Sequence, residues 1–231
     1  MAFKLAVDRE VFETFPGYEA AIVYACELVN GPSTAQSVAW LRDAELESRS
    51  RFDRDSLKDD PHIRAWQEAF AKFGVKKGKW PASVESLLKR VVSGKELPAI
   101  NALVDAYNAL SLHHMIPVGG EDRDRLASDL ELRFMSGAET FDTVNSGQPV
   151  LERVDAGEVA WCDAAGVTCR RWNWRQCRRT ALTENTRNAY FVLDRLPPYP
   201  HERLLAAAQN LEQRILQLSP SAKVTHEVLR G

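Results

Sequence analysis

The pattern of apolar and polar positions predicts two strands and then a helix in the first quarter of the chain. Residues 3–7 and 20–29 are apolar runs, and the second is continuous enough for a strand that is buried on both faces. Ser33 is a suitable N-cap for a helix over residues 34–52. A charged loop is expected over residues 53–60.

Three more helices are predicted before residue 116. Asp60 precedes Pro61, so a capping residue stands next to a proline at the first helical position. Apolar residues then recur at spacings of three and four as far as Gly74. The next helices are expected over residues 83–92 and from about 101 to 115, because glycine and proline follow each of them.

The second half of the chain changes to a strand-rich pattern. Apolar runs typical of strands occupy residues 129–134, 158–162, 167–172 and 189–193. A periodic helix is expected over residues 201–218 and a last strand over 223–229. The pattern therefore predicts an α/β fold of the α+β type, in which helices from the N-terminal half pack on a mostly β C-terminal half. No linker rich in Pro, Gly or Ser divides the chain, so residues 1–231 are expected to form a single domain.

Composition and charge narrow the class of protein. The chain has 231 residues, 45% of them apolar and 27% charged, which is the profile of a globular protein with a full core. Its formal net charge of −2 gives no global positive field, so DNA is not expected as a partner and any RNA has to meet a local basic patch. No apolar stretch is long enough to span a membrane and no secretory signal begins the chain, so a cytoplasmic protein is expected.

The common catalytic and metal-binding signatures are missing from the sequence. It has no phosphate-binding loop, no dinucleotide glycine pattern, no HExxH and no GxSxG. The spacing of Cys162, Cys169 and Cys177 is not that of a zinc site, so no metal and no other cofactor is expected. Reduced cysteines are expected in the cytosol.

One helix carries an unusual polar row. Asn101, Asp105 and Asn108 lie at i, i+4 and i+7, on a different face from the apolar stripe. Asparagine and aspartate are poor helix formers, so a row of them indicates hydrogen bonds to a ligand or to a neighbouring loop. In the second interpretation the row has a structural role and holds the Gly119-Gly120 loop or the start of the helix.

A second segment combines arginine and tryptophan. Residues 170–179 hold five arginines and two tryptophans, which suit phosphate pairing and base stacking. The alternative is a strand edge held by cation–π contacts. If residues 167–172 form a strand, Cys169 and Arg171 face one side while Arg170 and Trp172 face the other.

A third segment is the basic loop that contains Lys76, Lys77 and Lys79. Trp80 follows the three lysines, and a helix start lies just beyond it. An aromatic neighbour and a nearby helix N-terminus favour a contact with phosphate or RNA. The alternative is a solvated loop.

Several of these segments resemble one known family. Residues 100–108, I-N-A-L-V-D-A-Y-N, are similar to the I-N-N-L-V-D-x-x-N run in the editing (B3/B4) domain of the bacterial phenylalanyl-tRNA synthetase beta subunit. In register, residues 117–122 stand where that domain has P-L-H-A-F-D, residues 157–163 resemble its D-L-V-I-A-D strand, and residues 186–188 resemble its T-x-N motif. The resemblance is good over residues 75–195 and looser outside them. The chain also looks like the freestanding members of this group.

The resemblance implies a pocket for the aminoacylated 3′ end of a tRNA, where a mischarged amino acid is hydrolysed in trans. It implies that Asn101, Asp105 and Asn108 act on the ester or its attacking water. It also implies that the substrate is held by Gly119, Gly120, Arg171, Trp172, Asn173, Trp174 and Arg175. Two departures stand out: Gly119 replaces the synthetase domain's histidine, and residues 168–171 replace its M-G-G turn.

Three functions therefore stay open at the level of the sequence. The leading one is an aminoacyl-tRNA deacylase, since an activated ester needs only a positioned water and donors to the oxyanion. The second is a binding module without catalysis, which recognises tRNA or an amino-acid-like ligand. The third is a protein-interaction domain on an inherited fold. A complete phenylalanine-tRNA ligase is not expected.

Overall fold

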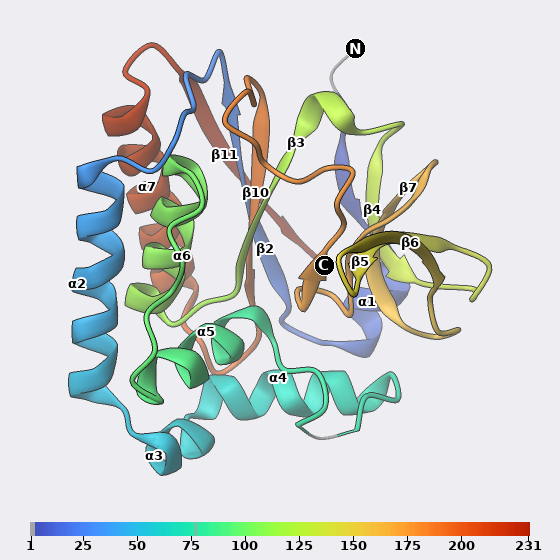
Figure 1. Ribbon diagram of the computed structural model, residues 1–231. Coiled ribbons are helices and arrows are strands. Elements are labelled where there is room, and N and C mark those ends of the chain that lie inside the picture. The colour runs from blue at the N-terminus through green and yellow to red at the C-terminus, as the bar shows by residue number, and fades with distance from the viewer. Residues whose placement is uncertain (1–2, 77) are drawn as a thin grey trace.

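Two β-sheets and a layer of helices make up the computed structural model, which describes residues 3–76 and 78–231 (Figure 1). The smaller sheet is antiparallel and has the strand order β11-β2-β10-β3. Its strands are β2 (Glu19–Cys26), β3 (Val118–Asp122), β10 (Ala189–Arg195) and β11 (Lys223–Arg230). It therefore joins segments from both ends of the chain.

The larger sheet has the order β1-β4-β7-β8-β5-β6, with the short β9 paired to β8. Its strands are β1 (Leu5–Val7), β4 (Leu130–Phe134), β5 (Thr140–Asn145), β6 (Gln148–Arg153), β7 (Val159–Asp163), β8 (Gly166–Arg170) and β9 (Arg175–Gln176). In Figure 1 this sheet lies to the right of the smaller one.

Most helices lie on the other side of the smaller sheet and beneath both sheets, whereas α1 (Arg9–Thr14) packs against β4 of the larger sheet. The others are α2 (Ala35–Arg51), α3 (Arg54–Asp59), α4 (Pro61–Lys72), α5 (Ser83–Val92), α6 (Ala102–His114) and α7 (His201–Leu218), with a 3-10 turn, η1 (Arg123–Arg125). Helices α6 and α7 cover one face of the smaller sheet, α2 packs outside α6, and α4 runs below (Figure 1). The predicted fold class is confirmed.

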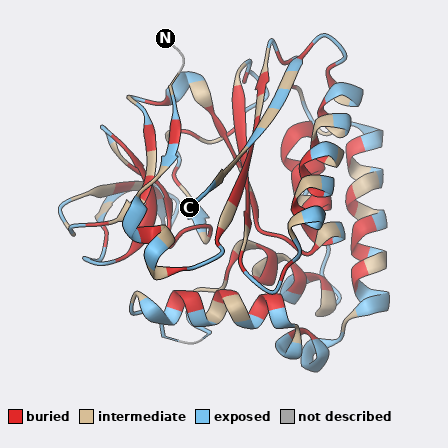
Figure 2. Ribbon diagram, turned by 180° about the vertical axis from the view of Figure 1, so that it is seen from behind, coloured by how far each residue is buried: buried red, intermediate tan, exposed pale blue. Residues whose placement is uncertain are grey.

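The smaller sheet is buried on both of its faces. Along β2, Ala21 and Val23 belong to the core formed with α6 and α7, whereas Ala20 and Ile22 belong to the core shared with the larger sheet. Figure 2 shows the same concentration of buried residues along the strands between the helices and the larger sheet. Burial on both faces explains the continuous apolar run in the sequence.

Strand β10 brings polar groups into the space between the sheets. Phe191 and Leu193 face the helices, while Tyr190 and Val192 belong to the core on the other face. Because side chains alternate along a strand, Asp194 falls on the same face as Tyr190 and Val192. A carboxylate thereby enters a largely apolar layer.

Four local predictions were wrong. The N-cap of α2 is Thr34, not Ser33, and the expected loop over 53–60 contains α3, whose first turn is capped by Asp53. The Gly119-Gly120 segment is the middle of strand β3, since Gly120 fits against β10 where a Cβ atom would lie 2.5 Å from the Phe191 ring. Strand β8 ends at Arg170, two residues before the predicted end.

No helix in the described part of the chain is long and apolar enough to cross a membrane.

Candidate functional site

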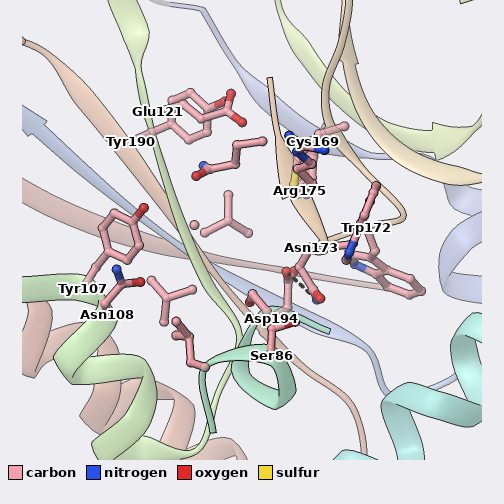
Figure 3. Close-up of a pocket in the computed structure, with 18 residues that line it drawn as sticks. Ser86, Tyr107, Asn108, Glu121, Cys169, Trp172, Asn173, Arg175, Tyr190 and Asp194 are labelled. Carbon is pink, nitrogen blue, oxygen red and sulfur yellow. Dashed lines mark hydrogen bonds between the residues drawn. The ribbon is translucent and has the colours of Figure 1, made fainter. Parts of the chain in front are cut away.

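A pocket of about 210 Å³ opens between the two sheets, with α5 and α6 along its side (Figure 3). Its apolar wall comes from Leu87, Val118, Trp161 and Val192 among others. Its polar groups come from α6, β3, β9, β10 and the turn after β8, and the ones with most bearing on chemistry are Asn108, Glu121, Asn173, Arg175 and Asp194. Pockets for drug-sized ligands measure roughly 300–1,000 Å³, so this one suits a smaller group such as a single amino acid.

The turn after β8 has an unusual backbone. Arg171 and Trp172 have φ angles of 45° and 65°, so two successive non-glycine residues adopt the left-handed region. Such a conformation is costly and is found where the surrounding structure enforces it. The Trp172 N–H donates to the Val159 carbonyl at 2.6 Å, and the indole packs edge-on against Tyr18 at 4.7 Å between centroids. The turn thereby buries Trp172 and places Asn173 in the pocket wall.

Asp194 is a buried carboxylate in this pocket and is 2% exposed. The Tyr18 hydroxyl donates to Oδ1 at 2.7 Å, and the Asn173 Nδ2 donates to Oδ2 at 3.2 Å. Burial raises the pKa of Asp194 to about 6, against the opposing effect of these two donors and of the Trp172 indole N–H. Among the described residues no cationic side chain lies within ion-pair distance of it. The Asn173 Oδ1 atom is buried beside it and has no hydrogen-bond partner among those residues.

Glu121 is a second buried carboxylate, and Figure 3 shows it with Tyr190 at the other end of the pocket from Asp194. The Tyr190 hydroxyl and the Thr180 hydroxyl both donate to its Oε2 atom. Burial raises the pKa of Glu121, while those two hydroxyl groups act in the opposite direction. The pocket therefore holds two carboxyl groups that differ in their hydrogen-bond environment.

The structure does not bring Asn101 and Asp105 to this pocket. Asn101 is the N-cap of α6, where its Oδ1 accepts from the Val104 N–H at 3.1 Å. Asp105 is fully buried and accepts from the Ile100 N–H at 2.9 Å and from the Ser37 hydroxyl at 3.0 Å. Both side chains hold the start of α6 in place. The expectation that they meet Gly119 and Asn173 in one pocket was wrong, because they face neighbouring backbone and helix α2.

Asn108 and Gly119 do line the pocket, but Gly120 lies behind it. Asn108 is half-buried, and its side chain makes no hydrogen bond to another described residue. The Gln176 Nε2 atom donates to the Gly120 carbonyl at 2.8 Å and would lie 3.1 Å from a Cβ atom placed on Gly119. Gly119 therefore leaves room for the glutamine that bridges the two sheets.

The predicted arginine–tryptophan segment divides into a structural part and an exposed part. The Arg171 guanidinium is stacked 3.6 Å from the Trp80 ring centroid and 4.8 Å from that of Trp174. It also pairs with Asp155 at 2.9 Å and is 3% exposed, so it fixes the loop before α5 against the turn and does not line the pocket. Arg175, in contrast, is exposed and lines the pocket. Trp172, Asn173 and Trp174 also line it.

The basic loop lies next to this stack. Lys76 and Lys79 are exposed, and the Lys79 Nζ atom lies 4.1 Å from the Trp80 ring centroid. Lys77 falls outside the described residues. RNA binding by these lysines stays a prediction.

The described lining of the pocket contains no pair of a nucleophile and a histidine. None of the histidines lines the pocket. In the described part of the chain no group of His, Cys, Asp and Glu is placed to hold a metal ion, and the four cysteines are free thiols. Sequence analysis missed Asp194, Glu121 and Cys169 as pocket residues. The only sequence signal for Asp194 is an acidic residue that ends the apolar run of residues 189–193.

Comparison with known proteins gives one family and one solved relative of note. The family model described as "B3/4 domain" matches residues 65–213. A search of curated proteins found no match. Among solved structures, an N-terminal fragment of the phenylalanyl-tRNA synthetase beta subunit from Pyrococcus horikoshii is similar, with a TM-score of 0.46 and 11% identity. That alignment covers 100% of this chain and 55% of the other, so the chain spans about half the length of this relative.

Proposed function

Because the chain belongs to the B3/4 domain family, we propose that it removes a wrong amino acid from a mischarged tRNA in trans. The observation that carries this proposal is the position of the pocket. Every residue that lines it lies between Ser83 and Asp194, inside the matched segment 65–213. The pocket is thus a feature of the family region.

The size and lining of the pocket fit the end of an aminoacyl-tRNA. The apolar wall suits an amino-acid side chain, and the volume of about 210 Å³ matches a group of that size. The terminal ribose and phosphate then lie at the mouth, where the exposed Arg175 can pair with phosphate. Trp174 offers a ring for stacking, and the loop with Lys76, Lys77 and Lys79 supplies local positive charge.

Hydrolysis in this pocket uses water held by polar side chains. An aminoacyl ester is activated, so positioning and electrostatic stabilisation lower the barrier without a protein nucleophile. Asn108 and Ser83 line the pocket with no side-chain hydrogen bond to another described residue, so they can hold the water or donate to the ester carbonyl. Asn101 and Asp105 support this site from outside by fixing the start of the helix that carries Asn108.

We propose that residues 1–231 act as one unit in the cytoplasm. The matched segment omits β1, β2 and β11, yet β2 is hydrogen-bonded to β10 and β1 to β4. The second candidate is a module that binds the aminoacylated end without hydrolysis. The absence of histidine from the described lining of the pocket favours this binding module.

Turnover separates the two candidates. The wild-type protein is incubated with a panel of tRNAs mischarged with small, branched and aromatic amino acids, and loss of the amino acid is followed. We expect hydrolysis of at least one member and a fall of at least tenfold in Asn108→Ala, since that amide faces the pocket. Asn185→Ala, on an exposed loop, is the matched control. Tight binding of an aminoacyl-tRNA with no hydrolysis of any member would assign the binding module instead.

A further inference from the structure

The end of the pocket at Asp194 presents two hydrogen-bond acceptors without a cation. Asp194 accepts from Tyr18 and Asn173, and the buried Trp172 indole N–H, which has no other partner among the described residues, also stabilises the carboxylate. Neither bond comes from a charged donor. A buried carboxylate without a cation is costly, and proteins normally pair it. A bound cation would therefore stabilise the Asp194 carboxylate.

Asn173 adds the second acceptor. Its Nδ2 atom has to face Asp194, because an ionised carboxylate offers no proton in return. Its Oδ1 atom is consequently directed away from the carboxylate, and it is buried without a partner among the described residues although Asn173 is only 8% exposed. A single cation with several N–H donors would satisfy Asp194 and Asn173 together.

Other charges do not fill this role. The side chains that face Asp194 are Tyr18 from the segment before β2, Trp172 and Asn173 from the turn after β8, and Cys169 from β8. Burial raises the pKa of both Tyr18 and Cys169, so the two are uncharged at neutral pH. Arg195, the next residue along β10, pairs with Glu19 at 2.9 Å.

We propose that Asp194 and Asn173 form a subsite for a primary ammonium group, so that the pocket accepts aminoacyl esters with a free α-amino group. An –NH₃⁺ group has three donors, enough for Asp194, the Asn173 carbonyl oxygen and one water. An N-acylated amino acid, such as the last residue of a peptidyl-tRNA, is neutral there and leaves the carboxylate unpaired. This substrate class rests on the proposed function, while ammonium binding itself needs no hydrolysis.

The pH dependence of binding has a defined direction. The pKa of Asp194 is about 6 in the free protein, so the carboxylate is ionised above that value and neutral below it. An α-amino group loses its proton near pH 8. Affinity for an α-ammonium ligand is therefore expected to be highest between about pH 6 and pH 8.

Calorimetric titration of the full chain with stable amide analogues tests the subsite. The probes are L-alaninamide, L-valinamide and L-phenylalaninamide, each beside its N-acetyl derivative. We expect at least one amide to bind, its N-acetyl form to bind at least tenfold more weakly, and binding to weaken as the pH falls below 6. Asp194→Asn should lose at least tenfold in affinity for the free amide and change little towards the N-acetyl form.

Asp122→Asn is the matched control, because Asp122 is also buried and accepts from the Thr186 hydroxyl, yet lies outside the pocket lining. The ligand comparison and the pH profile need only the wild-type protein, so they hold even if Asp194→Asn does not fold. Equal affinity for free and N-acetyl amides, or no binding of any amide at millimolar concentration, would overturn the subsite. Amide binding without deacylation would retain the subsite and remove the proposed hydrolysis.

Discussion

Two buried aspartates in this protein have opposite environments. Asp105, at the start of α6, accepts from a backbone N–H and from a serine hydroxyl in a site closed by helix α2. Asp194, at the end of β10, accepts from a tyrosine and an asparagine and faces a pocket. Neither has a cation within ion-pair distance among the described residues. The two carboxylates have the same number of hydrogen-bond donors, but only Asp194 adjoins a pocket and an unpartnered amide oxygen, that of Asn173. A buried polar side chain is therefore better evidence of function where it adjoins an open space.

The largest expected effect is on stability at Asp194 and depends on pH. Its folded-state pKa of about 6 exceeds the usual value of 3.8, so the folded protein resists ionisation of this carboxyl. This contribution to stability is fully present below about pH 4 and is lost as the pH rises through about 6. At about 1.4 kcal/mol per pKa unit, the loss is about 3 kcal/mol.

Asp194→Asn should remove this pH-dependent loss. The difference in unfolding free energy between the variant and the wild type is expected to shift in favour of the variant between pH 4 and pH 7.5. Urea unfolding at both pH values measures it. The same difference at both values would mean that Asp194 is already paired or solvated, and the contrast with Asp105 would disappear.

The next largest effect is expected on the free energy of unfolding when Asp105 is replaced. Asp105→Ala removes the acceptor of the buried Ser37 hydroxyl and of the part-buried Ile100 N–H, which costs about 1–3 kcal/mol. The melting temperature should fall, while deacylation per folded molecule stays at the wild-type level. Asp43→Ala, at an exposed site on the neighbouring α2, is the control. Loss of activity in a fully folded Asp105→Ala protein would give Asp105 a direct role after all.

The smallest effect is expected on tRNA affinity when the lysines of the basic loop are replaced. Replacing Lys76, Lys77 and Lys79 with alanine should weaken tRNA binding several-fold at low salt and reduce the salt slope by about 2, because each contact with a single strand contributes about 0.7. Replacing Lys4, Lys58 and Lys95 makes the same change in net charge away from the pocket. An equal effect of both triple variants would show a general charge effect in place of a local contact.

Most of the fold could be predicted from the sequence because its signals are local. Asp60 with Pro61 begins α4 where expected, and the periodic apolar row gives α7 its observed limits, His201–Leu218. The continuous apolar run of β2 correctly indicated burial on both faces. Strand β3 was missed because its two glycines have a low strand propensity, and only contact with β10 makes them necessary.

The sequence by itself determined most of the helices, the family resemblance and the short list of unusual segments, since capping, periodicity and motif spacing act over a few residues. Only the tertiary structure decided which polar groups share a pocket. Asn173 and Asp194 are 21 positions apart and meet because a left-handed turn after β8 faces the end of β10. Asn101 and Asp105 look equally functional in sequence, but their side chains bond to α2 and to nearby backbone, and they do not line the pocket. Hydrogen bonds between distant segments leave no periodic trace in the chain, so the distinction between these two sites belongs to the fold.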